Sequence, residues 1–104
     1  MPDHVDDRFE WDIDKSDRCL RERGFDFAYV SQLFDAKTYY EDVDDRQYDE
    51  ERNRCIGLIG AEFFTVIYTP RNVRKRLIAA RRSSLKEIQI YARYAGISAR
   101  SRSH

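Results

Sequence analysis

The sequence is poor in histidine. It contains only two, His4 and His104, and both lie near the ends of the 104-residue chain. Because chain ends are usually poorly ordered, neither is expected at a catalytic centre. This argues against an acid/base pair of histidines, a histidine-dependent triad and a typical zinc site.

Glycine and cysteine are also scarce, with four and two residues. No GxGxxG, GxxxxGK[ST] or GxSxG pattern occurs, which argues against dinucleotide-binding, P-loop and α/β-hydrolase chemistry. Cys19 and Cys55 lack CxxC or Cys/His spacing, so we expect buried reduced thiols in preference to a disulfide or a redox role. The acidic run "DVDD" lacks EF-hand spacing, and no metal or cofactor is expected.

Long apolar runs are missing as well. None approaches the roughly 18 to 20 residues of a membrane span, and the start "MPDHVDDRFEWD" has no apolar segment of a signal peptide. We therefore expect a cytoplasmic protein with no membrane association. Hydrophobic residues make up 41% of the chain, enough for one core. We expect a single domain over residues 1–96 and a flexible C-terminal tail over residues 97–104.

The net charge of zero hides a strong asymmetry. Residues 1–51 hold 17 acidic and 7 basic residues, a balance of −10, and residues 52–104 hold 2 acidic and 12 basic residues, a balance of +10. Such a split indicates an anionic partner for the basic half, with nucleic acid as the first candidate. The alternative is that the two halves neutralise each other across the fold.

Two short helices are predicted near the N-terminus, after an edge strand at "RFEWDI". Asp12 or Asp14 can cap the first helix, which Gly24 would end, and Asp26 can cap the second, "DFAYVSQLF". The run "KTYYEDV" could be a strand. We interpret the charged run that follows, "DVDDRQYDEER", as an exposed loop.

Three β-rich runs follow, "RNRCIGLIG", "AEFFTVIYT" and "VRKRLIAAR", and predict an antiparallel meander. In the last segment, Ser84 and Glu87 form a capping box and Gly96 is the expected end of a helix. The predicted fold is α+β, an antiparallel sheet packed against two N-terminal helices and one C-terminal helix.

The stretch "RKRLIAARRSSLKE" carries arginines at both ends of an apolar run. Regular alternation would place Arg76, Ala80 and Arg82 on one face of the strand and Leu77 and Arg81 on the other. Guanidinium groups fixed on a sheet can stabilise the charge that develops on a phosphodiester in a transition state. The alternative is that they only solvate the strand ends or pair with the acidic half.

For RNA, the nucleophile can be the 2′-hydroxyl of the substrate itself, so the protein has to position the backbone, stabilise charge and transfer protons. Candidate proton carriers are Glu51, Lys15 and Tyr68. Aromatic side chains can stack on bases, although tryptophan is more often part of a core. The aromatic candidates are Trp11, Tyr39, Tyr40 and Tyr48.

Several runs together resemble the BrnT toxin family. They are "FEWDIDK" from Phe9, Gly24 followed by Phe27, "LFD" from Leu33, "ER" at Glu51 with Gly57 beyond it, "VIYT" from Val66, "RLIAAR" from Arg76, and Glu87 with Tyr91. The resemblance spans about residues 9–91. It implies a RelE-like fold and a bacterial type II toxin that cleaves RNA without a metal, by 2′-hydroxyl attack, to inhibit translation.

The resemblance also implies partners. The substrate would be mRNA, free or on the ribosome. The neutralising partner would be a BrnA-type ribbon-helix-helix antitoxin in a heterotetramer, with DNA bound only through the antitoxin.

At matching positions we expect Arg76 and Arg81 as transition-state clamps, Arg52 to position RNA, and Lys15 or Glu51 to carry protons. Further candidate RNA contacts are Arg82, Trp11 and Tyr68.

One departure from the family concerns its usual Lys-His-Gly, which is Glu22, Arg23 and Gly24 here. The change predicts either lower activity or a phosphate-binding role for Arg23. It motivates an alternative, a catalytically weak, toxin-like binding subunit of an autoregulatory repressor complex. Direct DNA binding is less favoured, because no helix shows a clustered basic face.

Overall fold

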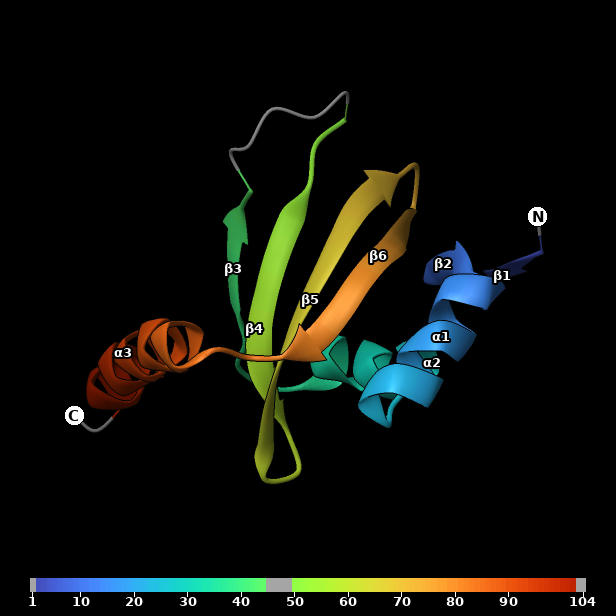
Figure 1. Ribbon diagram of the computed structural model, residues 1–104. Helices are drawn as coiled ribbons and strands as arrows, with labels where there is room; N and C mark the ends of the chain where they lie inside the picture. The colour runs from blue at the N-terminus through green and yellow to red at the C-terminus, as the bar shows by residue number, and fades with distance from the viewer. Residues whose placement is uncertain (1, 45–49, 103–104) are drawn as a thin grey trace.

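The computed structural model describes residues 2–44 and 50–102. A six-stranded sheet with the order β1-β2-β6-β5-β4-β3 forms the centre of the molecule (Figure 1). Its strands are β1 (Asp3–Val5), β2 (Phe9–Asp12), β3 (Tyr40–Val43), β4 (Asn53–Ile59), β5 (Glu62–Arg71) and β6 (Arg74–Arg82). The helices are α1 (Ile13–Arg23), α2 (Phe27–Val30), the 3-10 helix η1 (Ser31–Asp35) and α3 (Leu85–Arg102).

The sheet is mixed, which corrects the prediction of an antiparallel sheet within a correctly predicted α+β class. Strand β2 runs parallel to β6, with Trp11 opposite Leu77, whereas the other strand pairs are antiparallel. A parallel pair requires a long connection, and here most of the chain lies between the two strands. The predicted edge position of "RFEWDI" is also wrong, because β1 pairs with the outer side of β2.

Helix α1 begins and ends where the sequence predicts. The Asp12 carboxylate accepts hydrogen bonds from the backbone N–H groups of Asp14, at 2.8 Å, and Lys15, at 3.3 Å. Gly24 has a φ of 87° and ends the helix in the left-handed conformation. Asp26 caps α2 through the N–H of Tyr29 at 2.9 Å. These caps fix where α1 and α2 begin and where α1 ends.

The core lies between one face of the sheet and the helices α1, α2 and η1. Aromatic rings dominate it, with Phe25 edge-on to Phe64 and Trp11 edge-on to Phe27. Cys19 and Cys55 are buried and reduced, as expected. Tight packing has a further consequence at Gly57, where an added Cβ would lie 3.2 Å from the Leu33 and Tyr39 side chains.

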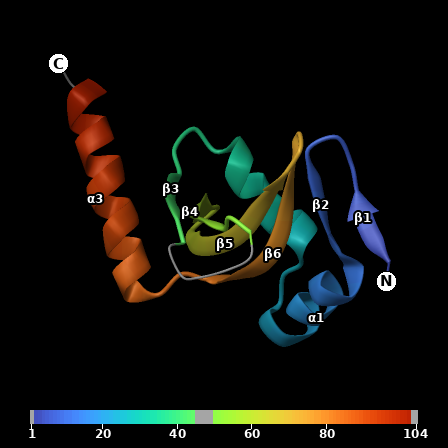
Figure 2. The same ribbon diagram turned by 90° about the horizontal axis from the view of Figure 1, so that it is seen from above.

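Helix α3 starts with the predicted capping box. The Ser84 N–H donates to the Glu87 carboxylate at 2.9 Å, and the Glu87 N–H donates to the Ser84 hydroxyl at 3.2 Å. Gly96 does not end the helix, which continues to Arg102, so that prediction is wrong. Helix α3 lies near the β3 side of the sheet, whereas α1 lies on the opposite side, near β2 and β6 (Figures 1 and 2). The division into a domain of residues 1–96 and a tail of residues 97–104 stays a prediction.

A β-bulge changes which arginines share a face of β6. Ile67 pairs with Ala79 and Tyr68 pairs with Leu77, so Ile78 is an extra residue between these two pairs. Leu77 and Ala80 are therefore both buried on the core side. Arg76 and Arg81 consequently share the opposite face, whereas regular alternation had placed them on different faces.

Candidate functional site

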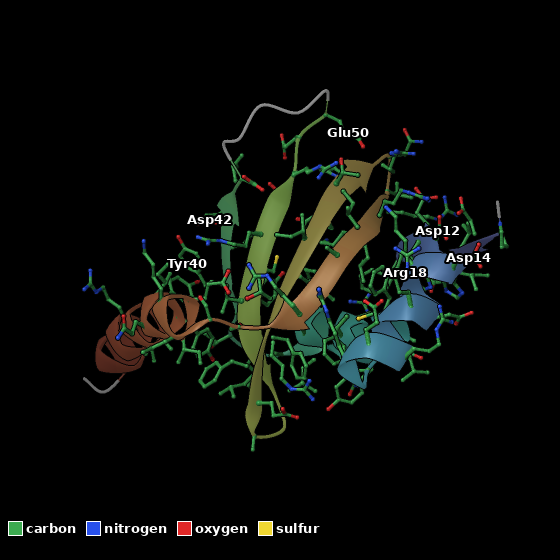
Figure 3. All side chains as sticks on the ribbon, viewed as in Figure 1. Asp12, Asp14, Arg18, Tyr40, Asp42 and Glu50 are labelled. Carbon is green, nitrogen blue, oxygen red and sulfur yellow. The ribbon has the colours of Figure 1, made fainter. Side chains whose placement is uncertain are left out.

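A hollow of about 620 Å³ lies on the face of the sheet opposite the core. Its lining comes from β3, the residue after it, and strands β4, β5 and β6 (Figure 3). The polar lining residues are Asp42, Asp44, Arg54 and Arg81, and the apolar ones are Val43, Ile67 and Ala79. Arg54 and Ile67 alternate with core residues of β4 and β5, and the pairing of Asp42 with Arg54 and of Ile67 with Ala79 brings the lining residues together.

Glu87 fixes the position of Arg81 at one end of this hollow. The two side chains form a bidentate pair, with Nη1–Oε1 at 2.5 Å and Nη2–Oε2 at 2.9 Å. Thr65 Oγ1 donates to the same carboxylate at 3.0 Å. Glu87 is only 4% exposed, whereas the Arg81 side chain is 46% exposed. The arginine is therefore held by a buried group while half of its surface faces solvent.

Hydrogen bonding keeps Glu87 ionised. Burial by itself raises the pKa of the Glu87 carboxyl, but the hydrogen bonds from Arg81, Ser84 and Thr65 outweigh burial and lower the pKa to about 2. The Glu87 carboxyl is thus ionised throughout the physiological pH range.

Arg54 is held in the same way on the neighbouring part of the face. Its Nε and Nη2 donate to the two oxygens of Asp42 at 3.0 and 2.6 Å, and its Nη1 lies 3.6 Å from Glu87 Oε2. The hydrogen bond to Asp42 raises the pKa of Arg54 despite its partial burial. Glu87 therefore links two guanidinium groups, and both are fixed beside one hollow.

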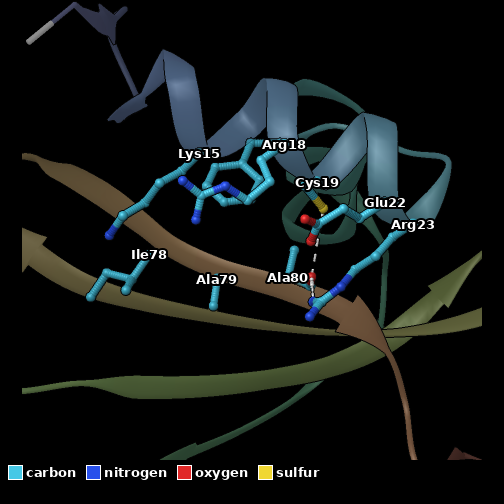
Figure 4. A pocket seen from close by; sticks show the side chains of 9 residues that line it. Lys15, Arg18, Cys19, Glu22, Arg23, Ile78, Ala79 and Ala80 are labelled. Atoms are coloured by element: carbon cyan, nitrogen blue, oxygen red, sulfur yellow. Dashed lines mark hydrogen bonds between the residues drawn. The ribbon is translucent and has the colours of Figure 1, made fainter.

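A narrower groove of about 280 Å³ runs between α1 and the edge of β6 (Figure 4). Strand β2 pairs with β6 only as far as Leu77, so α1 covers the next part of this edge. Arg23 Nη1 donates to the exposed-edge carbonyl of Ala80 at 2.6 Å. Lys15 and Arg18 lie further along α1 on the same side. Ala79 lines both the groove and the hollow, so the two join there.

Three of the four predicted catalytic residues lie in three different places. Arg81 lies in the hollow and Lys15 in the groove. Arg76 shares the face of Arg81 but points to the other end of the sheet, with Nη1 3.2 Å from Asp3 and 3.8 Å from Glu10. Arg76 and Arg81 lie near opposite ends of β6, and each is held by different carboxylates. The structure therefore does not bring the two arginines together.

Glu51 and Arg52 precede β4, at the end of the sheet where Asp44 lies. The Asp44 N–H donates to the Arg52 carbonyl at 2.8 Å. Glu51 is exposed, and the Arg52 side chain is half-buried. Within the predicted loop over residues 42–52, Asp42 and Val43 belong to β3, and residues 45–49, with Tyr48 among them, lie outside the described residues.

Three predicted RNA contacts lie on the core side of the sheet. Trp11 is 6% exposed, and His4 stacks on it at a centroid distance of 4.1 Å. Tyr68 is 5% exposed and donates to Glu41 at 2.8 Å, while burial and that bond raise the pKa of its hydroxyl. Arg82 is held by Glu62 at 2.7 Å on this side. These placements separate all three from the hollow.

Sequence reasoning missed Arg54, Asp42 and Arg18, and it gave Glu87 only a capping role. Arg54 had a detectable signal, because it lies between two buried residues of β4, Asn53 and Cys55. Nothing in the sequence indicated its pairing with Asp42, which depends on the register of β3 with β4.

His4 is better ordered than predicted, since it belongs to β1 and its Nε2 lies 2.7 Å from Asp6. His104 lies outside the described residues. No cluster of three or more histidine, cysteine or acidic side chains suited to a metal ion occurs in residues 2–44 and 50–102.

Within the same residues, no helix is both long enough and apolar enough to cross a membrane.

Fold and site together define a small α+β protein with two carboxylate-held arginines beside one hollow and three cationic side chains along an adjoining groove. The family model described as "Ribonuclease toxin, BrnT, of type II toxin-antitoxin system" matches residues 11–87, well over half of the chain. The chain belongs to this family of ribonuclease toxins, as the resemblance indicated. Its class implies an RNA substrate and an antitoxin partner. A comparison with curated proteins found no match.

Proposed function

We propose that this toxin cleaves RNA without a metal, by attack of the substrate's 2′-hydroxyl on the adjacent phosphorus, and thereby inhibits translation in the cytoplasm. The 2′-oxygen forms a bond to phosphorus and the bond to the 5′-oxygen breaks. The 2′-hydroxyl loses its proton to a base, and the leaving 5′-oxygen gains one from an acid. The products would carry a 2′,3′-cyclic phosphate and a 5′-hydroxyl.

Arg81 is the proposed transition-state clamp, and this assignment carries the proposal. A guanidinium stabilises the charge on the non-bridging oxygens best when it is already fixed in place. Glu87 fixes Arg81 through two hydrogen bonds while the Arg81 side chain stays 46% exposed. Arg54, held by Asp42 in the same hollow, supplies a second positive group.

The remaining roles follow the geometry of the sheet. Lys15, in the groove that joins the hollow at Ala79, is the proposed proton carrier, with Glu51 as the other candidate. Arg52 and Arg76 would contact RNA further along the same face. Trp11, Tyr68 and Arg82 are left out of this RNA path because they lie on the core side.

The proposed partner is a BrnA-type ribbon-helix-helix antitoxin in a heterotetramer, with DNA bound only through the antitoxin. A RelE-like arrangement of the sheet and helices is part of the same proposal. An idle toxin with an exposed catalytic arginine needs a partner to cover it, which supports an antitoxin that masks the hollow.

A second candidate is a catalytically weak subunit that serves mainly in repression. One observation favours it. Arg23, in place of the family histidine, donates to the Ala80 carbonyl at 2.6 Å and so completes the edge of β6. An arginine in that structural role is not positioned to exchange protons, because its guanidinium stays protonated.

Purified toxin incubated with single-stranded RNA in EDTA separates the two candidates. The proposed enzyme yields fragments with a cyclic phosphate end, and it leaves RNA uncut at positions where the 2′-hydroxyl is replaced by hydrogen. Absence of cleavage at micromolar protein would favour the binding subunit. Fragments with a 3′-hydroxyl and a 5′-phosphate would contradict the proposed chemistry.

A further inference from the structure

Helix α1 presents a stripe of charged side chains with an excess of positive charge. Lys15, Arg18, Cys19 and Glu22 line the groove against β6, and their spacing places them on one side of the helix. With Arg23 the groove holds three cations and one carboxylate, a balance of +2. We propose that this groove binds the phosphate backbone of the RNA strand beside the cleaved nucleotide, through Arg18.

The charged heads of Lys15 and Arg18 differ from those of the arginines in the hollow. Three arginines of the sheet are each engaged by a carboxylate: Arg54 by Asp42, Arg76 by Asp3 and Arg81 by Glu87. No hydrogen bond or ion pair joins the side chain of Lys15 or Arg18 to any residue within 2–44 and 50–102. Both can therefore bind a phosphate without first breaking an internal ion pair.

The floor of the groove leaves room for an RNA backbone. The β6 residues that line it are Ile78, Ala79 and Ala80, of which the two alanines have short side chains. The bulge at Ile78 leaves Ala79 exposed, and Arg23 already satisfies the Ala80 carbonyl. Figure 4 shows Lys15 and Arg23 extending from α1 toward the strand over this floor. An incoming strand meets small side chains and no free backbone acceptor at Ala80.

Continuity with the hollow identifies RNA as the occupant. Ala79 lines both surfaces, so a strand with its reactive phosphate at Arg81 would cross β6 over Ala79 and enter the groove. This inference rests on the proposed function, because it assumes that the reactive phosphate lies in the hollow. An acidic peptide of the antitoxin is the competing occupant, and the experiment below distinguishes the two.

Binding of a single-stranded 2′-O-methyl oligonucleotide tests the groove without cleavage. Fluorescence anisotropy over a range of salt concentrations gives Kd and its salt dependence. Arg18→Ala should weaken binding about fivefold and reduce the log–log salt slope by about 0.7, the value for one lost contact to a single strand. Arg18→Lys, which keeps the charge, should restore most of the slope.

Arg21→Ala is the matched control, because Arg21 lies on α1 but outside the groove. It should leave the salt slope unchanged, and circular dichroism should show all three variants folded. Equal slopes for Arg18→Ala and the unaltered protein would overturn the inference. So would unchanged RNA affinity combined with weaker binding of a poly-glutamate peptide, which would assign the groove to a protein partner.

Because the oligonucleotide has no free 2′-hydroxyl, this outcome is independent of catalysis. If the protein binds the oligonucleotide through Arg18 but cuts no RNA, the inference about the groove is supported and the proposed cleavage is contradicted. If the protein cuts RNA but Arg18 makes no contribution to binding, the proposed cleavage is supported and the inference about the groove is contradicted.

Discussion

Arg81 and Glu87 meet through two parallel hydrogen bonds, at 2.5 and 2.9 Å, across the junction between β6 and α3. Glu87 also caps α3 through the Ser84 N–H, so one buried carboxylate both starts the helix and orients the arginine. The position of the proposed clamp thus depends on where the last helix begins.

Glu87→Gln should lower stability in a pH-dependent manner. The pKa of Glu87 is about 2 in the folded protein and lies below its ordinary value of 4.5, so the ionised group stabilises the fold above about pH 4.5. That contribution is lost as the pH falls toward 2. We expect the variant to lose about 2 to 3 kcal/mol at pH 7 and to match the unaltered protein near pH 2.

Urea unfolding across this pH range measures the difference. Asp6, whose pKa is lowered to about 2 chiefly by the hydrogen bond from His4, titrates in the same window in both proteins and cancels. A difference that stays constant from pH 7 to pH 2 would show that Glu87 is not held ionised by Arg81.

Gly57→Ala should destabilise the fold. The new methyl group would lie 3.2 Å from Leu33 Cγ and 3.2 Å from Tyr39 Cβ, both in or against the packed core. Overpacking of this kind costs about 1 to 3 kcal/mol. Thermal unfolding checks the expectation, and an unchanged Tm would mean that the core can move aside there.

Gly96→Ala should act in the opposite direction. Gly96 lies inside α3, and nothing within 4 Å would meet an added Cβ. Alanine is favoured over glycine inside a helix by roughly 0.8 to 1 kcal/mol, so helix content and stability should rise. A loss of helix signal would instead support the helix end that the sequence predicted at Gly96.

The sequence predicted the elements of the fold better than their arrangement. Caps are local signals: Gly24, Asp26 and Ser84 are predicted correctly, and Asp12 is one of the two residues predicted to cap α1. The parallel pairing of Trp11 with Leu77 depends on segments far apart in the chain, and no local pattern reveals it. Strand β1 has only three residues, too few to show an alternating pattern.

The candidate site was predicted in part, and the bulge explains much of the rest. Arg81 and Lys15 were selected from the family resemblance, and the structure places them on adjoining surfaces. One unpaired residue, Ile78, reverses the alternation that had placed Arg76 and Arg81 on opposite faces. Trp11 was named as a base contact on its residue type, but burial against His4 and Phe27 makes it a core residue.

Single-turnover cleavage of RNA in EDTA by Arg81→Met tests the central claim most directly. Arg8→Met is the matched control, because Arg8 is also half-exposed and paired with a carboxylate, Asp35 at 2.8 Å, but lies outside the hollow and the groove. Removal of one preorganised group that stabilises the transition state typically costs about 100-fold to 1,000-fold in rate. We predict a loss of that size for Arg81→Met and an unchanged rate for Arg8→Met. A folded Arg81→Met protein that cleaves as fast as the unaltered toxin would contradict the account.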